Sequence, residues 1–180
     1  MGALIMLPGL GGSGRRHWHS HWEAREPAAR RFAPSSWDAP VLEDWLEALD
    51  GAVDAAEEPP VLVAHSLACL LVAHWARRRP TGARGAFLVA PPDEASPAFP
   101  PEVESFRPAP RAALPFPALI VASADDPYGA PPAIRRLAAD WGAGLVELGA
   151  LGHINAASGL GAWPEGWALL SAFRAGCGAS

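Results

Sequence analysis

The chain has 180 residues, of which 50% are hydrophobic and 18% charged, and its formal net charge is −5 at pH 7. This length suits one domain with a substantial core, so we predict a single domain over residues 1–180. The negative charge argues against nucleic acid as a partner, no apolar run approaches the ~18 residues that span a bilayer, and the first residues lack the basic segment of a secretory signal, which together predict a cytoplasmic protein without a membrane partner.

Short apolar runs alternate with helical patterns along the whole chain. The predicted strands are Ala3–Leu7, Arg30–Ala33, Val61–Ala64, Ala86–Ala90, Ala118–Ala122 and Leu145–Leu148. The predicted helices are His17–Glu26, a segment that follows Asp38, Leu67–Arg79, Pro132–Trp141 and Pro164–Arg174. The second of these helices places Leu42, Trp45, Leu46, Leu49 and Val53 on one face. Asp38 or a neighbour is expected to cap it.

Six short strands separated by helices predict a mostly parallel sheet that is covered on both faces, a three-layer α/β/α sandwich. Ligands of such sheets bind beyond the carboxyl ends of the strands. The segment Pro91–Pro117 is long, irregular and rich in proline. It is either a surface excursion or a rim over the site, and it is too short for a large lid.

Ser66 stands at the centre of the most informative motif, V-L-V-A-H-S-L-A over residues 61–68. An apolar strand that ends on a serine and passes at once into a helix is the pattern of a nucleophile elbow. The simpler interpretation is a serine that caps the helix. The usual G-x-S-x-G pattern has alanine at both glycine positions here, Ala64 and Ala68.

A nucleophilic serine needs a base and a group that orients the base. His153 follows the last predicted strand and is the candidate base. Asp125 and Asp126 both follow the strand at 118–122, and we favour Asp126 as the acid, with Asp125 as the alternative. All of these residues follow strand ends, so we expect them at one edge of the sheet.

The glycine-rich segment P-G-L-G-G-S-G at residues 8–14 follows the first strand. For a hydrolase it would supply the backbone N–H of Leu10 to an oxyanion hole, beside the N–H of Leu67. The same segment also matches G-x-G-x-x-G, a dinucleotide-binding pattern, with Asp38 near the position of the acidic residue. That alternative leaves the serine, aspartate and histidine motifs unexplained.

Residues 17–22 read H-W-H-S-H-W, and His17 and His21 would share a face of a helix. No carboxylate completes a zinc site, so we predict neither a metal nor another cofactor. His17, Trp18 and His65 are instead expected to contribute to substrate binding.

Several of these motifs together resemble the small, single-domain α/β-hydrolases of the retinoblastoma-binding-protein-9/YdeN type. The resemblance covers nearly the whole chain and is most specific in S-x-D-D-P-Y at 123–128 and G-H-I-N-A-x-S-G-L-G-x-W-P-E-G at 152–166. It implies a minimal α/β-hydrolase fold and a Ser-Asp-His triad whose acid is the second aspartate, Asp126. The pocket-protein-binding string L-x-C-x-E is absent at residues 67–71, so no retinoblastoma partner is implied.

The sequence therefore predicts a serine hydrolase, and more narrowly a carboxylesterase that cleaves small acyl esters through Ser66, His153 and Asp126. The alternatives are a non-catalytic binding module on the same fold and a dinucleotide-binding protein. The physiological substrate, the choice between ester and amide, and the oligomeric state stay open.

Overall fold

The structure is a computed structural model, which describes residues 2–177. Six strands form the sheet: β1 (Leu4–Leu7), β2 (Ala29–Arg31), β3 (Val61–His65), β4 (Gly85–Val89), β5 (Ala118–Ser123) and β6 (Gly144–Leu148). Five α-helices accompany them: α1 (Trp18–Arg25), α2 (Leu42–Asp54), α3 (Leu67–Arg78), α4 (Pro131–Trp141) and α5 (Pro164–Cys177). Two short 3₁₀ helices complete the fold, η1 (Pro101–Phe106) and η2 (Ala156–Ser158).

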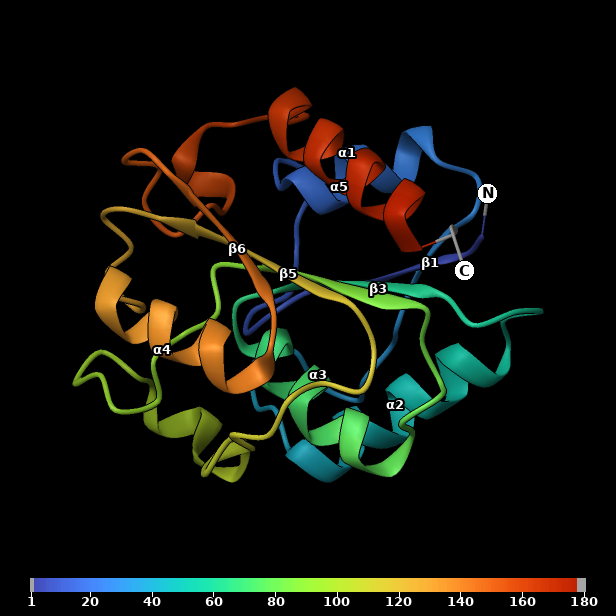
Figure 1. Cartoon of the computed structure of the whole chain (residues 1–180), viewed down its shortest axis with the longest axis horizontal. Helices are drawn as coiled ribbons and strands as arrows, with labels where there is room; N and C mark the ends of the chain where they lie inside the picture. Colours follow the sequence, from blue (N-terminus) through green and yellow to red (C-terminus); the bar gives the residue numbers. More distant parts are fainter. Residues whose placement is uncertain (1, 178–180) are drawn as a thin grey trace.

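All paired strands run parallel, in the order β2-β1-β3-β4-β5-β6. Helices α1 and α5 cover one face of the sheet, and α2, α3 and α4 cover the other (Figure 1). The predicted three-layer α/β/α sandwich with about six strands is thus confirmed. The strand order reverses between β1 and β3, so the loops that follow these two neighbouring strands meet where α/β sheets usually bind ligands.

The strands alternate their side chains between two cores. Leu62 and Ala64 of β3 face the core under α2, α3 and α4, whereas Val61 and Val63 face the core under α1 and α5. Both sets are buried, which explains why β3 reads as a continuous apolar run. The elbow strand is therefore fixed from both sides.

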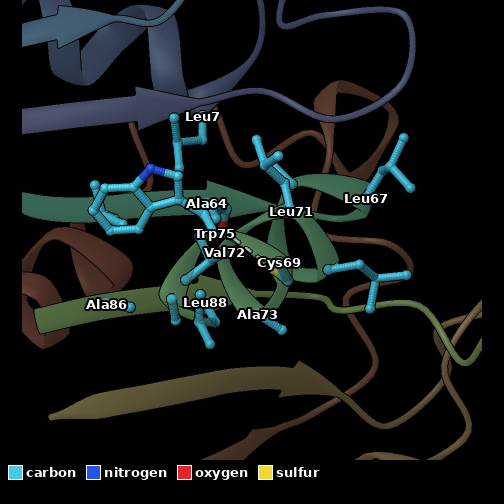
Figure 2. Close-up of a cluster of buried hydrophobic side chains, with 14 of the residues drawn as sticks. Leu7, Ala64, Leu67, Cys69, Leu71, Val72, Ala73, Trp75, Ala86 and Leu88 are labelled. Carbon is cyan, nitrogen blue, oxygen red and sulfur yellow. Dashed lines mark hydrogen bonds between the residues drawn. The ribbon is translucent and has the colours of Figure 1, made fainter. Parts of the chain in front are cut away.

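Helix α3 is the central helix of the larger core. Its side chains Leu71 and Trp75 pack beside strand residues Leu7 and Leu88 (Figure 2). The indole N–H of Trp75 donates to Asp50 of α2 at 2.8 Å, so even its polar atom has a partner. Burial of these apolar side chains anchors α3, the helix that begins directly after Ser66.

The start of α2 differs from the prediction that Asp38 or a neighbour caps it. The helix begins at Leu42, and its N-cap residue Val41 makes no side-chain cap. The N–H of Leu42 instead donates to the hydroxyl of Ser105 in η1, at 3.1 Å. The partner for this helix end comes from 63 residues further along the chain, a distance that no local sequence pattern reveals.

Candidate active site

Ser66 occupies the turn between β3 and α3 and has an unusual backbone conformation, with φ 56° and ψ −125°. A non-glycine residue in such a region costs on the order of 1–3 kcal/mol and persists only where its surroundings enforce it. Here the N–H of Ser66 donates to the carbonyl of Val89, and its carbonyl accepts from the N–H of Cys69, both at 2.9 Å. Hydrogen bonds to strand β4 and to helix α3 thus hold the strained serine in place.

Two small residues allow this turn. Ala64 and Ala68 stand where the usual elbow pattern has glycine, and both are completely buried. The loop after β1 also approaches the elbow closely, at Gly9: a Cβ there would lie 2.9 Å from the carbonyl oxygen of His65 and 3.0 Å from Cβ of Ser66. Glycine is therefore required in the neighbouring loop, while alanine fits within the elbow itself.

A chain of hydrogen bonds joins the three residues predicted to be catalytic. The Ser66 hydroxyl lies 2.8 Å from Nε2 of His153. Nδ1 of His153 lies 2.9 Å from both carboxylate oxygens of Asp126. The Asp126 side chain is only 3% exposed, and its Oδ1 also accepts the N–H of Tyr128 at 2.9 Å. The carboxylate is thus fixed, and it orients the imidazole so that Nε2 can accept a proton from Ser66.

The neighbouring aspartate, Asp125, has different partners. Its Oδ1 accepts the Ser123 hydroxyl at 2.8 Å and the Gly152 N–H at 2.7 Å. These hydrogen bonds, that of Ser123 first, lower the pKa of the Asp125 carboxyl. Asp125 therefore holds the loop that carries His153 without contacting the imidazole.

The two backbone amides expected to form an oxyanion hole belong to residues that line a pocket together with Ser66. Leu67 is the first residue of α3, and Leu10 follows Gly9 in the loop after β1. A Cβ on Gly9 would lie 3.3 Å from the Leu67 nitrogen, which shows how near the two segments come. Neither N–H donates to a backbone carbonyl within residues 2–177.

Two pockets meet at Ser66. The first has a volume of about 170 Å³ and is mostly apolar; its lining comprises Leu10, Ser66, Leu67, Pro92, Phe99, Pro100, Val103, Tyr128, His153 and Asn155. The second has a volume of about 530 Å³ and is more polar; its lining comprises Leu10, Gly12, Gly14, Arg16, His17, His65, Ser66, His153, Asn155, Ala156 and Ala157. The segment at 91–117 contributes four residues to the first pocket, so it borders the site as a rim.

The residues expected to bind substrate have separate positions. His17 and His65 line the second pocket. Nε2 of His65 also lies 2.9 Å from the backbone carbonyl of His153, so the residue before the serine supports the loop of the base. Trp18 lines neither pocket: it is 1% exposed, and its indole N–H donates to the carbonyl of Ile154 at 2.8 Å. This position corrects the expectation for Trp18 and indicates a role in bracing the loop after His153.

The histidines of segment 17–22 do not share one helix face. His17 precedes α1 and has extended backbone angles, so it shares no helix face with the exposed His21. Within residues 2–177, no group of three histidine, cysteine, aspartate or glutamate side chains is placed to hold a metal ion. In the same range, no helix is long and apolar enough to cross a membrane.

A sequence model of the serine hydrolase family matches residues 4–172. The chain belongs to this serine hydrolase family. A comparison with curated proteins finds no match. The match covers the strands, the elbow and the loops of Asp126 and His153, and it supports a hydrolase that acts on a small-molecule substrate.

Several solved structures have the same fold. A YdeN-like hydrolase from Pectobacterium atrosepticum is 31% identical, with 97% of this chain and 91% of that chain covered and a TM-score of 0.88. The ydeN gene product of B. subtilis is 21% identical, with coverages of 97% and 100% and a TM-score of 0.81. A monoacylglycerol lipase from Paleococcus ferrophilus is 16% identical, with coverages of 83% and 85% and a TM-score of 0.66. The predicted resemblance to YdeN-type α/β-hydrolases is confirmed.

The structure adds Tyr128 and Asn155 to the site residues of this serine hydrolase; the sequence patterns did not indicate them. The centroids of the Tyr128 and His153 rings lie 4.7 Å apart, and both Tyr128 and Asn155 line the first pocket. Each stands two residues after a selected one, Asp126 or His153. Proximity in sequence to those two residues was the available signal.

Acid sensitivity of folding is a testable property of the buried histidines near this site. Burial, reinforced by Arg31 and His153, lowers the pKa of His17 from 6.5 to about 4. Burial also holds the pKa values of His19 and His65 well below 6.5. The unfolded chain therefore binds protons below pH 6.5 that the folded chain does not accept. The resulting stability is complete above pH 6.5 and is lost as the pH falls toward 4.

We therefore expect the free energy of unfolding, measured by urea titration, to fall by at least about 2 kcal/mol between pH 7.5 and pH 5. His17 alone accounts for a drop of about that size, at about 1.4 kcal/mol per pKa unit. A His17→Gln variant should lose correspondingly less over the same interval. Equal unfolding free energies at the two pH values would show that these imidazoles do not have to stay neutral in the folded protein.

Proposed function

We propose that this protein is a carboxylesterase that cleaves small acyl esters through an acyl-enzyme formed on Ser66. The observation that carries the proposal is the continuous hydrogen-bond chain from Asp126 through His153 to Ser66, at 2.8–2.9 Å, on a strained turn between two pockets. We infer that the whole chain acts as one hydrolase domain, although residues 1 and 178–180 lie outside the described part. The cytoplasmic location stays a prediction.

The proposed reaction begins when the Ser66 oxygen attacks the ester carbonyl. His153 Nε2 takes the serine proton as the bond forms, and Asp126 stabilises the resulting imidazolium through Nδ1. The imidazolium then gives this proton to the departing alcohol oxygen, which leaves an acyl group on Ser66. A water molecule, deprotonated by His153, hydrolyses the acyl-enzyme and restores the free serine.

Negative charge develops on the carbonyl oxygen during both attacks. We assign its stabilisation to the backbone N–H groups of Leu67 and Leu10, which have no backbone acceptor within residues 2–177. Both are held in place before the reaction, one by α3 and the other by the loop that Gly9 brings against the elbow. Fixed donors of this kind typically lower the barrier by about 3–4 kcal/mol each.

The first pocket is suited to an apolar part of the ester. Its walls include Phe99, Pro100 and Val103, and its volume of about 170 Å³ suits a short chain. We therefore expect kcat/KM across p-nitrophenyl esters of increasing acyl length to be highest for short acyl groups. A search for the best chain length is also the first direct test for ester hydrolysis.

Val103→Ala enlarges this pocket by removing two methyl groups at a buried wall position. We expect kcat/KM for a longer ester, relative to a shorter one, to rise about tenfold, the usual effect of about one methylene in an apolar pocket. Val41→Ala is the matched control, because Val41 is 55% exposed and lines neither pocket. An unchanged chain-length profile in Val103→Ala would remove this pocket from the account.

A further inference from the structure

The second pocket at Ser66 differs in charge from the first. Its lining contains one guanidinium, that of Arg16, and three imidazoles, those of His17, His65 and His153, but no carboxylate. The buried carboxylate near the site, Asp126, is already paired with His153. A pocket with cationic and N–H donor groups and no negative charge favours an anionic ligand.

Arg16 stands at this pocket with its charge uncompensated. Its side chain is exposed, and within residues 2–177 it forms neither a salt bridge nor a hydrogen bond, whereas Arg31 of the same region pairs with Glu23 at 2.7 Å. Arg16 and Ser66 both line this pocket. A negatively charged group bound beside Arg16 would thus belong to the same molecule as the reacting ester.

His17 supplies a second, independent sign of a missing partner. The residue is 4% exposed, and its Nδ1 accepts the N–H of His19 at 3.2 Å. Because Nδ1 accepts, the neutral ring carries its proton on Nε2. This Nε2 is buried and has no hydrogen-bond partner within residues 2–177. A buried donor without an acceptor is costly, and His17 is itself part of the pocket wall, so an anion that drew this N–H toward the pocket would supply the missing acceptor.

The N-terminus of α1 also favours negative charge in this pocket. His17 is the N-cap of this helix, so the pocket lies at the positive end of the helix dipole. Gly14, which also lines the pocket, has no atom within 4 Å of where a Cβ would lie, so the loop leaves open space there. The feature thus has room for a ligand, a free guanidinium and an unpaired N–H donor.

We propose that this pocket is a subsite for a carboxylate, and that the protein prefers esters that carry a carboxylate in one of their two halves. The fork of N–H donors on the Arg16 guanidinium matches the two oxygens of a carboxylate, and His17 brings an unpaired N–H to the wall of the same pocket. The inference rests on the proposed esterase function and adds the substrate class to it. The ester carbonyl would lie at Ser66, with an apolar part in the first pocket and the carboxylate in the second.

Two matched pairs of esters test the proposal, one for each half of the molecule. Monobutyl glutarate against butyl hexanoate places the carboxylate on the acyl half. The butyrate ester of 3-hydroxypropanoic acid against butyl butyrate places it on the alcohol half. Hydrolysis is followed by pH-stat titration for the wild-type protein, for Arg16→Gln, and for Arg15→Gln. Arg15 is an exposed neighbour of the same charge that does not line the pocket.

In at least one pair we expect the wild-type protein to cleave the charged ester with the higher kcat/KM. Arg16→Gln should lower that kcat/KM about tenfold and leave the neutral ester unchanged, while Arg15→Gln changes neither. Raising the salt concentration should weaken the cleavage of the charged ester only, because the guanidinium is exposed to solvent.

If the wild-type protein cleaves the neutral ester of each pair at least as well as the charged one, the carboxylate subsite is overturned while the proposed esterase function stands. An equal loss in Arg15→Gln would also overturn the subsite, because a general surface field would then explain the preference. If the wild-type protein cleaves none of the four esters, the proposed esterase function fails, and the carboxylate subsite fails with it.

Discussion

Ser66→Ala is expected to reduce kcat for ester hydrolysis by about a millionfold, the scale of the loss when the nucleophile of a triad is removed. The Ser66 hydroxyl lies 2.8 Å from Nε2 of His153, and within residues 2–177 no second hydroxyl forms a hydrogen bond to this imidazole. Any activity that persists would come from direct attack by water on the ester, with the amides of Leu67 and Leu10 stabilising the charged carbonyl oxygen. The measurement is the initial rate on the best p-nitrophenyl ester.

Folding of this variant should be intact. Alanine keeps the Cβ of serine, so the strain at φ 56° is the same in both proteins, and the backbone bond from the residue 66 N–H to Val89 is retained. Circular dichroism and the thermal midpoint are therefore the controls. A folded Ser66→Ala protein with wild-type turnover would show that another group performs the chemistry.

Asp126→Asn is expected to lower kcat about ten-thousandfold while the backbone of the site stays in place. An asparagine oxygen can still accept the N–H of Tyr128, as Oδ1 of Asp126 does. The asparagine amide, however, would donate to Nδ1 of His153 and so leave the imidazole proton on Nε2. That tautomer cannot accept the Ser66 proton, and the imidazolium formed during attack would also lack its counter-charge.

Asp125→Asn is the matched control, one residue away and with the same change in charge. Asp125 bonds the Ser123 hydroxyl and the Gly152 N–H, and an asparagine oxygen can accept both. We expect kcat to stay within about tenfold of wild type. The reverse order of effects, with the larger loss in Asp125→Asn, would mean that the carboxylate at 125 orients the base during turnover.

The fold was predictable because its strongest signals are local. Apart from β2 (Ala29–Arg31), the strands of the sheet appear as short, largely apolar runs, and Ser66, Asp126 and His153 follow strand ends, which parallel strands place at one edge. The elbow was recognisable although Ala64 and Ala68 replace the usual glycines, since both alanines fit a fully buried position.

Features that depend on distant segments were not predictable in the same way. The start of α2 is bonded by Ser105, and Trp18 braces Ile154, a residue 136 positions later. An aromatic residue near the glycine loop has the same local pattern whether it lines a pocket or fills the core. The division of the site into an apolar and a cationic pocket likewise needs the packing of segments 10–17, 92–103 and 153–157 around Ser66.

Labelling with a fluorophosphonate probe, followed by peptide mapping, tests the central claim most directly. Such a probe forms a covalent bond with a serine only when a neighbouring base activates the hydroxyl. We predict stoichiometric modification at Ser66 in the wild-type protein, and none in Ser66→Ala or after acid unfolding. A folded wild-type protein that stays unlabelled at Ser66 would contradict the account, because the hydrogen-bond chain through His153 and Asp126 would then not activate the serine.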